Sequence, residues 1–295
     1  MSLFFSLLVN GLAMGVIYAM MAMGLILLIR AVGILNFAQG ELLMFGAYIS
    51  SALILDFELP MYIMIPLAFI SFCLVGVIFM LTIYWPLRKA SYPAATIIAT
   101  MGASIVLKEL ATMIWGPLPR SLPAIITDGA GKPAILNIGG VPIQWQYVMI
   151  LIIGSVLIFL IYMLFEKLYI GKIMQAASQD SYAANLLGVP TIITIAATYM
   201  IVSILASVGG YLVSPIFMVR NTLGTLQLRA FAAVVIGGFG NIQGAIAGSL
   251  IVGLIEVFST VGLSGYKDVT VFLLLIVFLL LRPQGLFGEK IKDKA

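Results

Sequence analysis

The chain has 295 residues, of which 63% are hydrophobic and 9% are charged, and its mean hydropathy is +1.20. A soluble domain cannot carry this composition, so we expect an integral membrane protein. The net charge of +4 accompanies no basic run with interleaved aromatic residues, so we expect no nucleic-acid partner. One cysteine and no histidine exclude an intramolecular disulfide and most metal or triad chemistry, and no metal site is predicted.

Apolar segments that suit membrane-spanning helices follow one another along the whole chain. They predict an all-α, polytopic membrane helix bundle with eight or nine spans, in one domain that covers residues 1–295. The N-terminus lacks a basic region and a small-residue cleavage site, so the first segment is expected to be a retained span. The segments cover residues 3–29, 34–55, 61–85, 94–115, 148–165, 192–213, 231–239, 245–261 and 269–281.

Small residues recur at helix-packing spacing in the first and eighth segments, where we expect helices to approach closely. They are Gly11, Gly15 and Ala19, and then Gly244, Ala247, Gly248 and Ser249. The glycine-rich stretch 237–244 separates two short apolar segments and predicts a broken helix pair near Asn241. At membrane depth such a break requires surrounding protein or water.

Positive charges near the span ends predict the topology. The positive-inside rule puts the densest clusters in the cytoplasm, with the N-terminus outside, the C-terminus inside and residues 116–146 outside. The clusters are Arg30, Arg88 with Lys89, Lys167 with Lys172, and Arg282 with Lys290, Lys292 and Lys294; the exceptions are Arg120, Lys132 and Lys267.

The longest polar interval near the middle of the chain is 165–190. Asp180 can cap a short helix from Ser181 to Leu187, which Gly188 and Pro190 would end. The helix has too few apolar side chains to anchor in lipid but more than a solvated loop requires. Docking into a groove of another protein and an ordinary interhelical loop both fit this pattern.

Polar residues inside apolar spans are costly and therefore informative. Asn36, Gln39 and Glu41 cluster after Arg30; a helix that begins near Ala38 would have Asn36 at its cap and Glu41 in its first turn, which is a purely structural alternative. Lys108 and Glu109 are expected at the outer aqueous boundary, and Glu256 is expected to face a neighbouring helix or a cavity.

The stretch around Gly240, Asn241 and Gln243 is a further candidate for the substrate pathway. Backbone groups freed by a glycine-rich break suit the carboxylate and ammonium of a zwitterion. No enzyme signature is present, because Gly131-Lys132 lacks the rest of a phosphate loop and the glycines at 237–240 follow no soluble strand. We therefore expect neither enzymatic activity nor a cofactor.

Four motifs in order strongly resemble the inner-membrane permease subunits of bacterial branched-chain amino acid ABC importers, over nearly the whole chain. They are Asn10-Gly11-Leu12-Ala13-Met14-Gly15 with Asn36-Phe37-Ala38-Gln39-Gly40-Glu41, the interval from Gly171 to Gly188, Gly237-Gly238-Phe239-Gly240-Asn241-Ile242-Gln243-Gly244-Ala245, and Arg282-Pro283-Gln284-Gly285-Leu286-Phe287-Gly288. Many members have histidine where this chain has Gln39, which leaves hydrogen bonding rather than proton transfer at that position.

The resemblance implies half of a transport pathway in the bacterial inner membrane. A second, related permease subunit, two cytoplasmic ATPase subunits and an extracytoplasmic solute-binding protein would complete the importer. The segment 166–190 would be its cytoplasmic coupling segment, and the residues implied in coupling are Gly171, Met174, Ala176, Asp180, Ala183, Leu186, Leu187 and Gly188. Other cargoes carried by related permeases, namely urea or short amides, other hydrophobic amino acids and sugars, remain open, as does a secondary transporter or channel that works alone.

Overall fold

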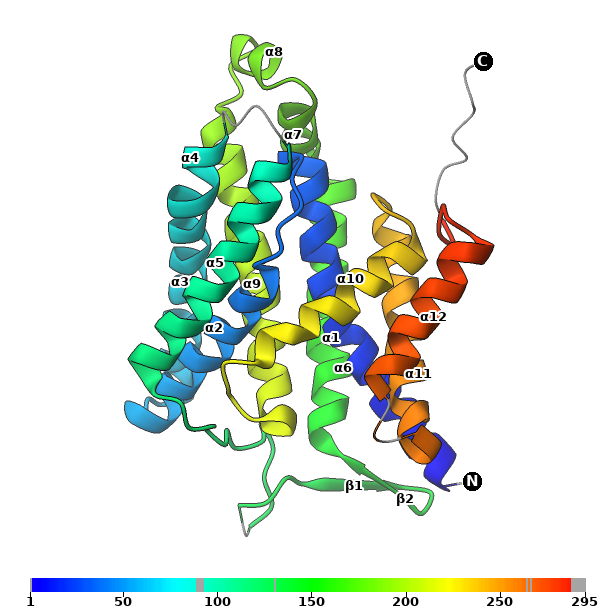
Figure 1. The fold of residues 1–295 in the computed structure, drawn as a ribbon. Coiled ribbons are helices and arrows are strands. Elements are labelled where there is room, and N and C mark those ends of the chain that lie inside the picture. The colour runs from blue at the N-terminus through cyan, green and yellow to red at the C-terminus, as the bar shows by residue number, and fades with distance from the viewer. Residues whose placement is uncertain (1, 89–92, 130, 264, 266, 288–295) are drawn as a thin grey trace.

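The computed structural model describes residues 2–88, 93–129, 131–263, 265 and 267–287 (Figure 1). Among the residues singled out above, Lys89, Gly288, Lys290, Lys292 and Lys294 lie outside this part of the chain.

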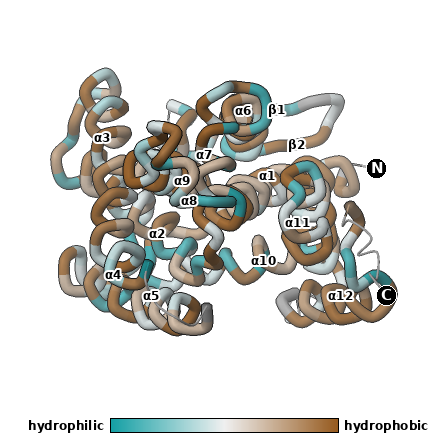
Figure 2. Tube along the Cα trace, turned by 90° about the horizontal axis from the view of Figure 1, so that it is seen from above, coloured by the Kyte–Doolittle hydropathy of each residue, from teal (hydrophilic) through white to brown (hydrophobic). Residues whose placement is uncertain are grey.

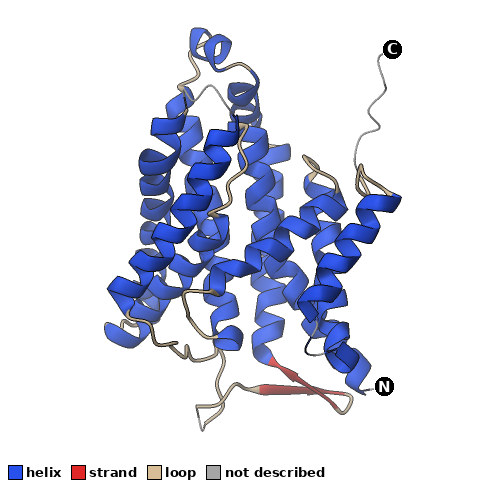
Figure 3. Cartoon of the chain, viewed as in Figure 1, coloured by secondary structure: helices blue, strands red, loops and turns tan. Residues whose placement is uncertain are grey.

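The described residues form a helix bundle with one small β-hairpin (Figure 3). The elements in chain order are α1 (Ser2–Val32), α2 (Gln39–Ser51), the π-helix η1 (Ala52–Asp56), α3 (Met61–Phe79), the π-helix η2 (Met80–Tyr84), α4 (Trp85–Leu87), α5 (Pro93–Trp115), β1 (Ile135–Ile138), β2 (Val141–Gln144), α6 (Trp145–Glu166), α7 (Tyr169–Gln179), α8 (Ser181–Leu186), α9 (Thr191–Phe217), the 3-10 helix η3 (Leu223–Thr225), α10 (Leu226–Gly237), α11 (Ile242–Leu263) and α12 (Lys267–Leu281).

Within the described residues, six helices are long and apolar enough to cross a membrane, which confirms the predicted polytopic bundle. They cover Leu3–Val32, Met61–Leu87, Ala94–Trp115, Trp145–Glu166, Thr191–Phe217 and Ile242–Gly262. The sequence predicted eight or nine spans, and the difference lies in α2, α10 and α12, which are shorter. Apolar segments alone do not reveal that α2 and α10 begin inside the bundle.

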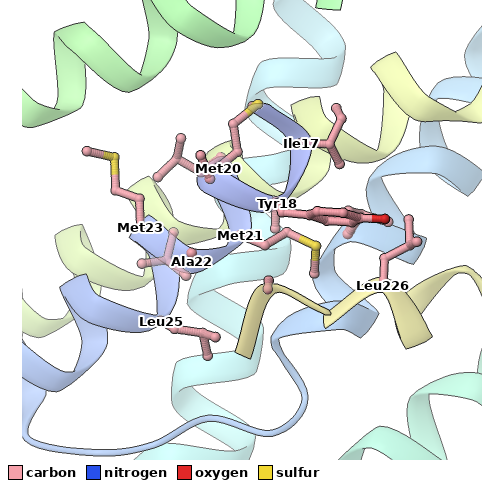
Figure 4. Close-up of a cluster of buried hydrophobic side chains, with 14 of the residues drawn as sticks. Ile17, Tyr18, Met20, Met21, Ala22, Met23, Leu25 and Leu226 are labelled. Carbon is pink, nitrogen blue, oxygen red and sulfur yellow. The ribbon is translucent and has the colours of Figure 1, made fainter. Parts of the chain in front are cut away.

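Helix α1 is the centre of the bundle and is buried on all sides from Ala13 to Leu28. Its neighbours are α6, α9, α10 and α11, which surround it when the bundle is seen from above (Figure 2). Ile17, Met20 and Met21 are fully buried, and Leu226 of α10 lies near them (Figure 4). A helix that is apolar around its whole circumference has no solvent face to present. The methionines fill the irregular gaps between the surrounding helices.

Glycines set the close approach of α1 to α11. A Cβ on Gly253 would lie 2.5 Å from the Cα of Gly15, and a Cβ on Gly15 would lie 2.8 Å from the Cα of Leu250. A Cβ on Gly11 would meet the Cα of Leu254 at 3.0 Å. The predicted packing roles of Gly11 and Gly15 are therefore confirmed, because the two backbones touch where these side chains are missing.

The two ends of the bundle differ. The β1–β2 hairpin lies at one end, and α7 and α8 lie at the other (Figures 1 and 3). Arg120, an exception to the charge pattern, forms an ion pair with Asp56 at 2.7 Å near the hairpin end. The loops that the sequence assigned to opposite membrane faces thus lie at opposite ends.

The interruptions of the helices differ from those predicted. The chain descends from the end of α1 through residues 33–38 before α2 begins, and residues 218–222 precede η3 and α10 (Figure 1). The predicted break near Asn241 is instead a tight turn between α10 and α11, on the α7 side of the bundle. Gly238 and Gly240 adopt φ of 109° and 81° there, which a glycine accommodates without a steric penalty.

The two late motifs of the sequence pack against each other. The amide nitrogens of Leu286 and Phe287 donate to the carbonyl oxygens of Ile236 (2.8 Å) and Gly237 (3.0 Å) at the end of α10. A Cβ on Gly285, which has φ of 82°, would lie 2.5 Å from the Cα of Gly238. The segment after α12 therefore satisfies the last carbonyl groups of α10 and holds the α10–α11 turn.

Candidate functional site

A cluster of buried polar side chains surrounds the first turn of α2. Asn36, Gln39 and Glu41 are 1%, 0% and 3% exposed, in a bundle whose core is mostly apolar. The Asn36 Oδ1 accepts from the amide nitrogen of Ala38 at 2.9 Å, and α2 begins at the next residue. Glu41 lies in the first turn of α2, as predicted. Asn36 does not occupy the predicted cap position, because the N-cap residue is Ala38, two positions later. The apolar segment begins at Ile34 but α2 begins only at Gln39, and the bond from the Asn36 side chain to the backbone favours the non-helical conformation between them.

Gln227 joins the start of α10 to the start of α2. Its Oε1 accepts from the amide nitrogen of Gly40, and its Nε2 donates to the carbonyl oxygen of Asn36 at 3.0 Å. A Cβ on Gly40 would collide with the carbonyl group of Gly224 in η3. Two helix N-termini, each with partial positive charge, therefore meet inside the bundle.

Glu41 is the charged centre of this cluster. The Ser104 hydroxyl donates to its Oε1 at 2.8 Å, and the Lys108 Nζ lies 3.6 Å from the same oxygen. A Cβ on Gly224 would lie 2.7 Å from the Glu41 Oε2, so a side chain there would displace this carboxylate. The side chain of Lys108, expected at the outer aqueous boundary, is 34% exposed and pairs with this carboxylate on α2. Its neighbour Glu109 is exposed on α5.

Several buried polar atoms of the cluster have no hydrogen-bond partner in the described part of the protein. They are the Asn36 Nδ2, both polar side-chain atoms of Gln39 and the Glu41 Oε2. Leaving a buried donor or acceptor unpaired costs about 1–3 kcal/mol. Native proteins pair nearly all such atoms with protein groups, ordered water, an ion or a ligand. Chemically, the Glu41 carboxylate offers an acceptor of the kind that suits an ammonium group, and the two helix N-termini offer the partial positive charge that suits a carboxylate.

A cavity of about 290 Å³ lies on the α7 side of the cluster. Its lining includes Gly33 and Leu35 from the unwound segment, Thr96 from α5 and Phe239 from the α10–α11 turn. The amide nitrogen of Phe37, in the same unwound segment, donates to the Thr100 Oγ1 at 3.2 Å. The segment that lines the cavity at residues 33–35 therefore leads directly into the polar cluster at Asn36 and Gln39.

A second buried charge pair links α10 to α1 and α11. Glu256 is 4% exposed; its Oε1 lies 3.0 Å from the Arg229 Nε, and its Oε2 accepts from the Tyr18 hydroxyl. The expectation that Glu256 faces a neighbouring helix is confirmed. Arg229 was missed, because the apolar segment was started at Phe231 and left this cation outside it. The sequence signal that could have identified Arg229 is the presence of an arginine within an apolar stretch.

The other predicted pathway residues lie apart from the cluster. The Arg30 Nε donates to the carbonyl oxygen of Gly240 at 2.6 Å. The Asn241 Oδ1 accepts from the amide nitrogen of Gly244 at 3.0 Å, which caps α11, and the Gln243 Nε2 donates to the Tyr162 hydroxyl at 2.9 Å. The structure gives each of these three residues a contact that stabilises the α10–α11 turn.

The polar interval 166–190 contains two helices, of which the sequence predicted only α8. Asp180 caps α8 as predicted, because its Oδ1 accepts from the amide nitrogens of Tyr182 (3.0 Å) and Ala183 (2.9 Å). Leu186 and Leu187 are 72% and 84% exposed at the tip. The earlier helix, α7, was missed, although buried small and apolar residues at every third position were its signal.

The residues assigned to coupling divide into two groups. Gly171 and Met174 are buried on the inner face of α7, and a Cβ on Gly171 would collide with the carbonyl groups of Leu164 and Phe165 in α6. Ala183 is half-buried. The exposed members are Ala176, Asp180, Leu186, Leu187 and Gly188.

The sequence matches the family described as "Branched-chain amino acid transport system / permease component" over residues 7–281. The chain belongs to this permease family. LivH of Escherichia coli strain K12, a high-affinity branched-chain amino acid transport system permease protein, is 31% identical to this permease, and the match covers 97% of the chain and 96% of LivH. BraD of Pseudomonas aeruginosa PAO1, which carries the same description, is 29% identical with the same coverage.

Among solved structures, the permease is similar to "PsaBC from Streptococcus pneumoniae in complex with Fab". The TM-score is 0.48 and the identity is 15%, over 94% of this chain and 89% of that chain. The curated relatives are named as transport permease proteins rather than enzymes. With six long apolar helices, the chain is a multi-pass membrane permease.

Proposed function

We propose that this chain is the transmembrane permease subunit of an ABC importer that passes branched-chain or other hydrophobic amino acids into the cytoplasm. Residues 1–295 form one permease domain in the bacterial inner membrane, in contact with lipid, with the N-terminus outside, the C-terminus inside and the segment 166–190 in the cytoplasm. A second, related permease subunit forms the other half of the pathway. Two ABC ATPase subunits supply the energy, and an extracytoplasmic solute-binding protein delivers the substrate.

The observation that carries this proposal is the buried polar cluster at the facing starts of α2 and α10. Glu41 is the counter-ion for the substrate ammonium group, while backbone N–H groups of the helix starts and Lys108 attract the carboxylate. Asn36 and Gln39 supply hydrogen bonds without proton transfer. The backbone groups freed at Gly240 and Asn241, together with Gln243, border the cytoplasmic exit.

The cluster is tightly packed, so passage requires that α2 and α10 separate. A Cβ on Gly40 would overlap the Gly224 carbonyl group, and a Cβ on Gly24 of α1 would lie 2.5 Å from the Gln39 Nε2. Such a closed contact suits a pathway that opens only when the ATPase subunits act. The apolar substrate side chain then moves past residues 33–38 into the adjoining cavity.

Reconstitution tests the proposal. Proteoliposomes that contain this chain, the second permease and the two ATPases are supplied with the loaded binding protein, and uptake of radiolabelled leucine, isoleucine and valine is measured with and without internal ATP. ATP-dependent uptake supports the proposal. Uptake of urea, short amides or a sugar in place of amino acids would show that the importer carries a different substrate. Transport by this chain alone would favour a secondary transporter.

The exposed tip of α8 gives a prediction about coupling. Leu187→Asp puts a charge on a side chain that is 84% exposed, so the fold should persist, while docking of an ATPase should weaken. We expect copurification of the ATPase subunits and ATP-dependent uptake to fall roughly tenfold or more, as for loss of an interface anchor worth about 1–2 kcal/mol. Asp180→Ala should act in the same direction through loss of the cap, worth about 1 kcal/mol.

The control is Ile135→Asp, which changes an exposed apolar residue of β1 at the opposite end of the bundle. It should leave ATPase copurification unchanged. Normal uptake by an inserted Leu187→Asp variant would show that α8 is not the docking element.

A further inference from the structure

Arg30 connects three separate elements at the α7 end of the bundle. It lies in the last turn of α1, and its guanidinium binds the Glu166 carboxylate at the end of α6. Its Nε donates to the Gly240 carbonyl oxygen at 2.6 Å in the turn between α10 and α11. A planar guanidinium can direct separate N–H groups to two acceptors at once, which a lysine ammonium does less well.

The same residue touches the coupling segment through its backbone. The Ser178 hydroxyl, near the end of α7, lies within hydrogen-bond distance of the Arg30 carbonyl oxygen and of the Gln175 carbonyl oxygen of its own helix, and its single O–H is shared between them. Gln175 in turn donates from its Nε2 to the Phe165 carbonyl oxygen at 2.8 Å. Helix α7 is therefore fixed to the ends of both α1 and α6, and a displacement of α7 must shift Arg30 or break these bonds.

Helix α10 carries the other half of the connection. It has 12 residues and no internal proline, so it is a straight element of about 18 Å. Its C-terminal end is the turn that Arg30 binds, and its N-terminal end carries Gln227, which bonds to Gly40 and Asn36 in the polar cluster. A short, regularly hydrogen-bonded helix moves as a unit, so a shift at one end appears at the other.

We propose that Arg30 is the positioning residue that couples the cytoplasmic segment to the substrate pathway. On this proposal, which rests on the proposed function, movement of α7 displaces Arg30, Arg30 moves the α10–α11 turn, and α10 withdraws Gln227 from Gly40. The polar cluster opens because the backbone bond between the starts of α2 and α10 is released. Glu166 holds the guanidinium in the orientation that reaches Gly240.

The test compares variants that remove different parts of this contact. Arg30→Gln removes both side-chain bonds, Arg30→Lys retains the charge opposite Glu166 but not the second donor to Gly240, and Glu166→Gln weakens the ion pair alone. Arg88→Gln is the matched control, because Arg88 is an exposed arginine at the same end that stacks on Trp85 of its own helix segment. Each variant is assembled with the partner subunits in proteoliposomes.

Two readouts separate coupling from folding. The first is the number of amino acids imported per ATP hydrolysed, which should fall roughly fivefold or more in Arg30→Gln and Arg30→Lys while ATPase copurification is retained. The second is an environment-sensitive fluorophore on Leu228→Cys, an exposed position in the first turn of α10, in a Cys73→Ser background. Its emission should change on nucleotide binding in the wild type and in Arg88→Gln but not in Arg30→Gln.

The outcomes are distinguishable. A normal import-to-ATP ratio and a normal fluorescence change in Arg30→Gln, or in Arg30→Lys if the glutamine variant fails to insert, overturn the proposal. A wild-type complex that imports no amino acid overturns the proposed function and this proposal with it. A lower number of amino acids imported per ATP and no fluorescence change in Arg30→Gln, with normal values of both in Arg88→Gln, support the role of Arg30.

Discussion

Replacing Glu41 with alanine is expected to reduce ATP-dependent amino acid uptake by roughly tenfold to a hundredfold, the loss that follows when a hydrogen bond to a charged group worth about 1.5–3 kcal/mol is removed. The carboxylate is 3% exposed and lies between Ser104 and Lys108. Both of these residues contact Oε1, whereas Oε2 has no hydrogen-bond partner within the described residues. We expect that oxygen to accept from the substrate ammonium group. The measurement is the initial rate of labelled leucine uptake in proteoliposomes.

A second experiment separates the transport role of Glu41 from its structural role. Breaking a buried ion pair leaves an uncompensated charge. Because the Lys108 side chain is 34% exposed, we expect the free energy of unfolding to fall by only about 1–3 kcal/mol, less than for a fully buried pair. The double variant Glu41→Gln with Lys108→Met removes both charges and should recover thermal stability. Recovered uptake in that double variant would show that the pair serves the fold alone.

Replacing Gly253 with valine is expected to have the largest effect on folding. A Cβ there would lie 2.5 Å from the Cα of Gly15, so backbone meets backbone and no side-chain rotation can relieve the overlap. Overpacking of this kind typically costs about 1–3 kcal/mol and more when helices must separate. Since α1 is the central helix, we expect a lower thermal transition and loss of most inserted protein.

The control lies on the same helix. A Cβ on Gly262 would meet no atom within 4 Å, so Gly262→Val changes the same residue type without a clash. Membrane-fraction yield and thermal aggregation in detergent report the difference. Equal stability of the two valine variants would mean that α1 and α11 do not pack at Gly15 and Gly253.

The long helices could be predicted from sequence because each carries its own signal. The apolar segments at 94–115 and 269–281 correspond closely to α5 and α12, and the cap at Asp180 correctly marked α8. Helix starts inside the bundle carried a weaker signal. The apolar run beginning at residue 34 continues through the unwound segment, whereas α2 begins only at Gln39, after the Asn36 side chain binds the backbone at Ala38.

The candidate site was predicted in part for a related reason. Asn36, Gln39 and Glu41 stand out because polar residues are costly in apolar spans, and that argument needs no tertiary structure. Their partners come from distant segments: Ser104 and Lys108 from α5, and Gln227 from α10. The glycine-rich stretch at 237–244 was read as an opening at membrane depth, but its positive φ values serve a reversal held by Arg30.

The meeting of two helix starts at Glu41 has an electrical consequence. Each helix N-terminus carries roughly half a positive charge, so together with the Lys108 ammonium they outweigh the single carboxylate. Sodium ions and protons approaching this point would meet repulsion, whereas a zwitterion brings its own negative end. We therefore expect the closed subunit to limit ion leakage without a hydrophobic constriction. A sodium flux into liposomes that contain the resting complex would contradict this.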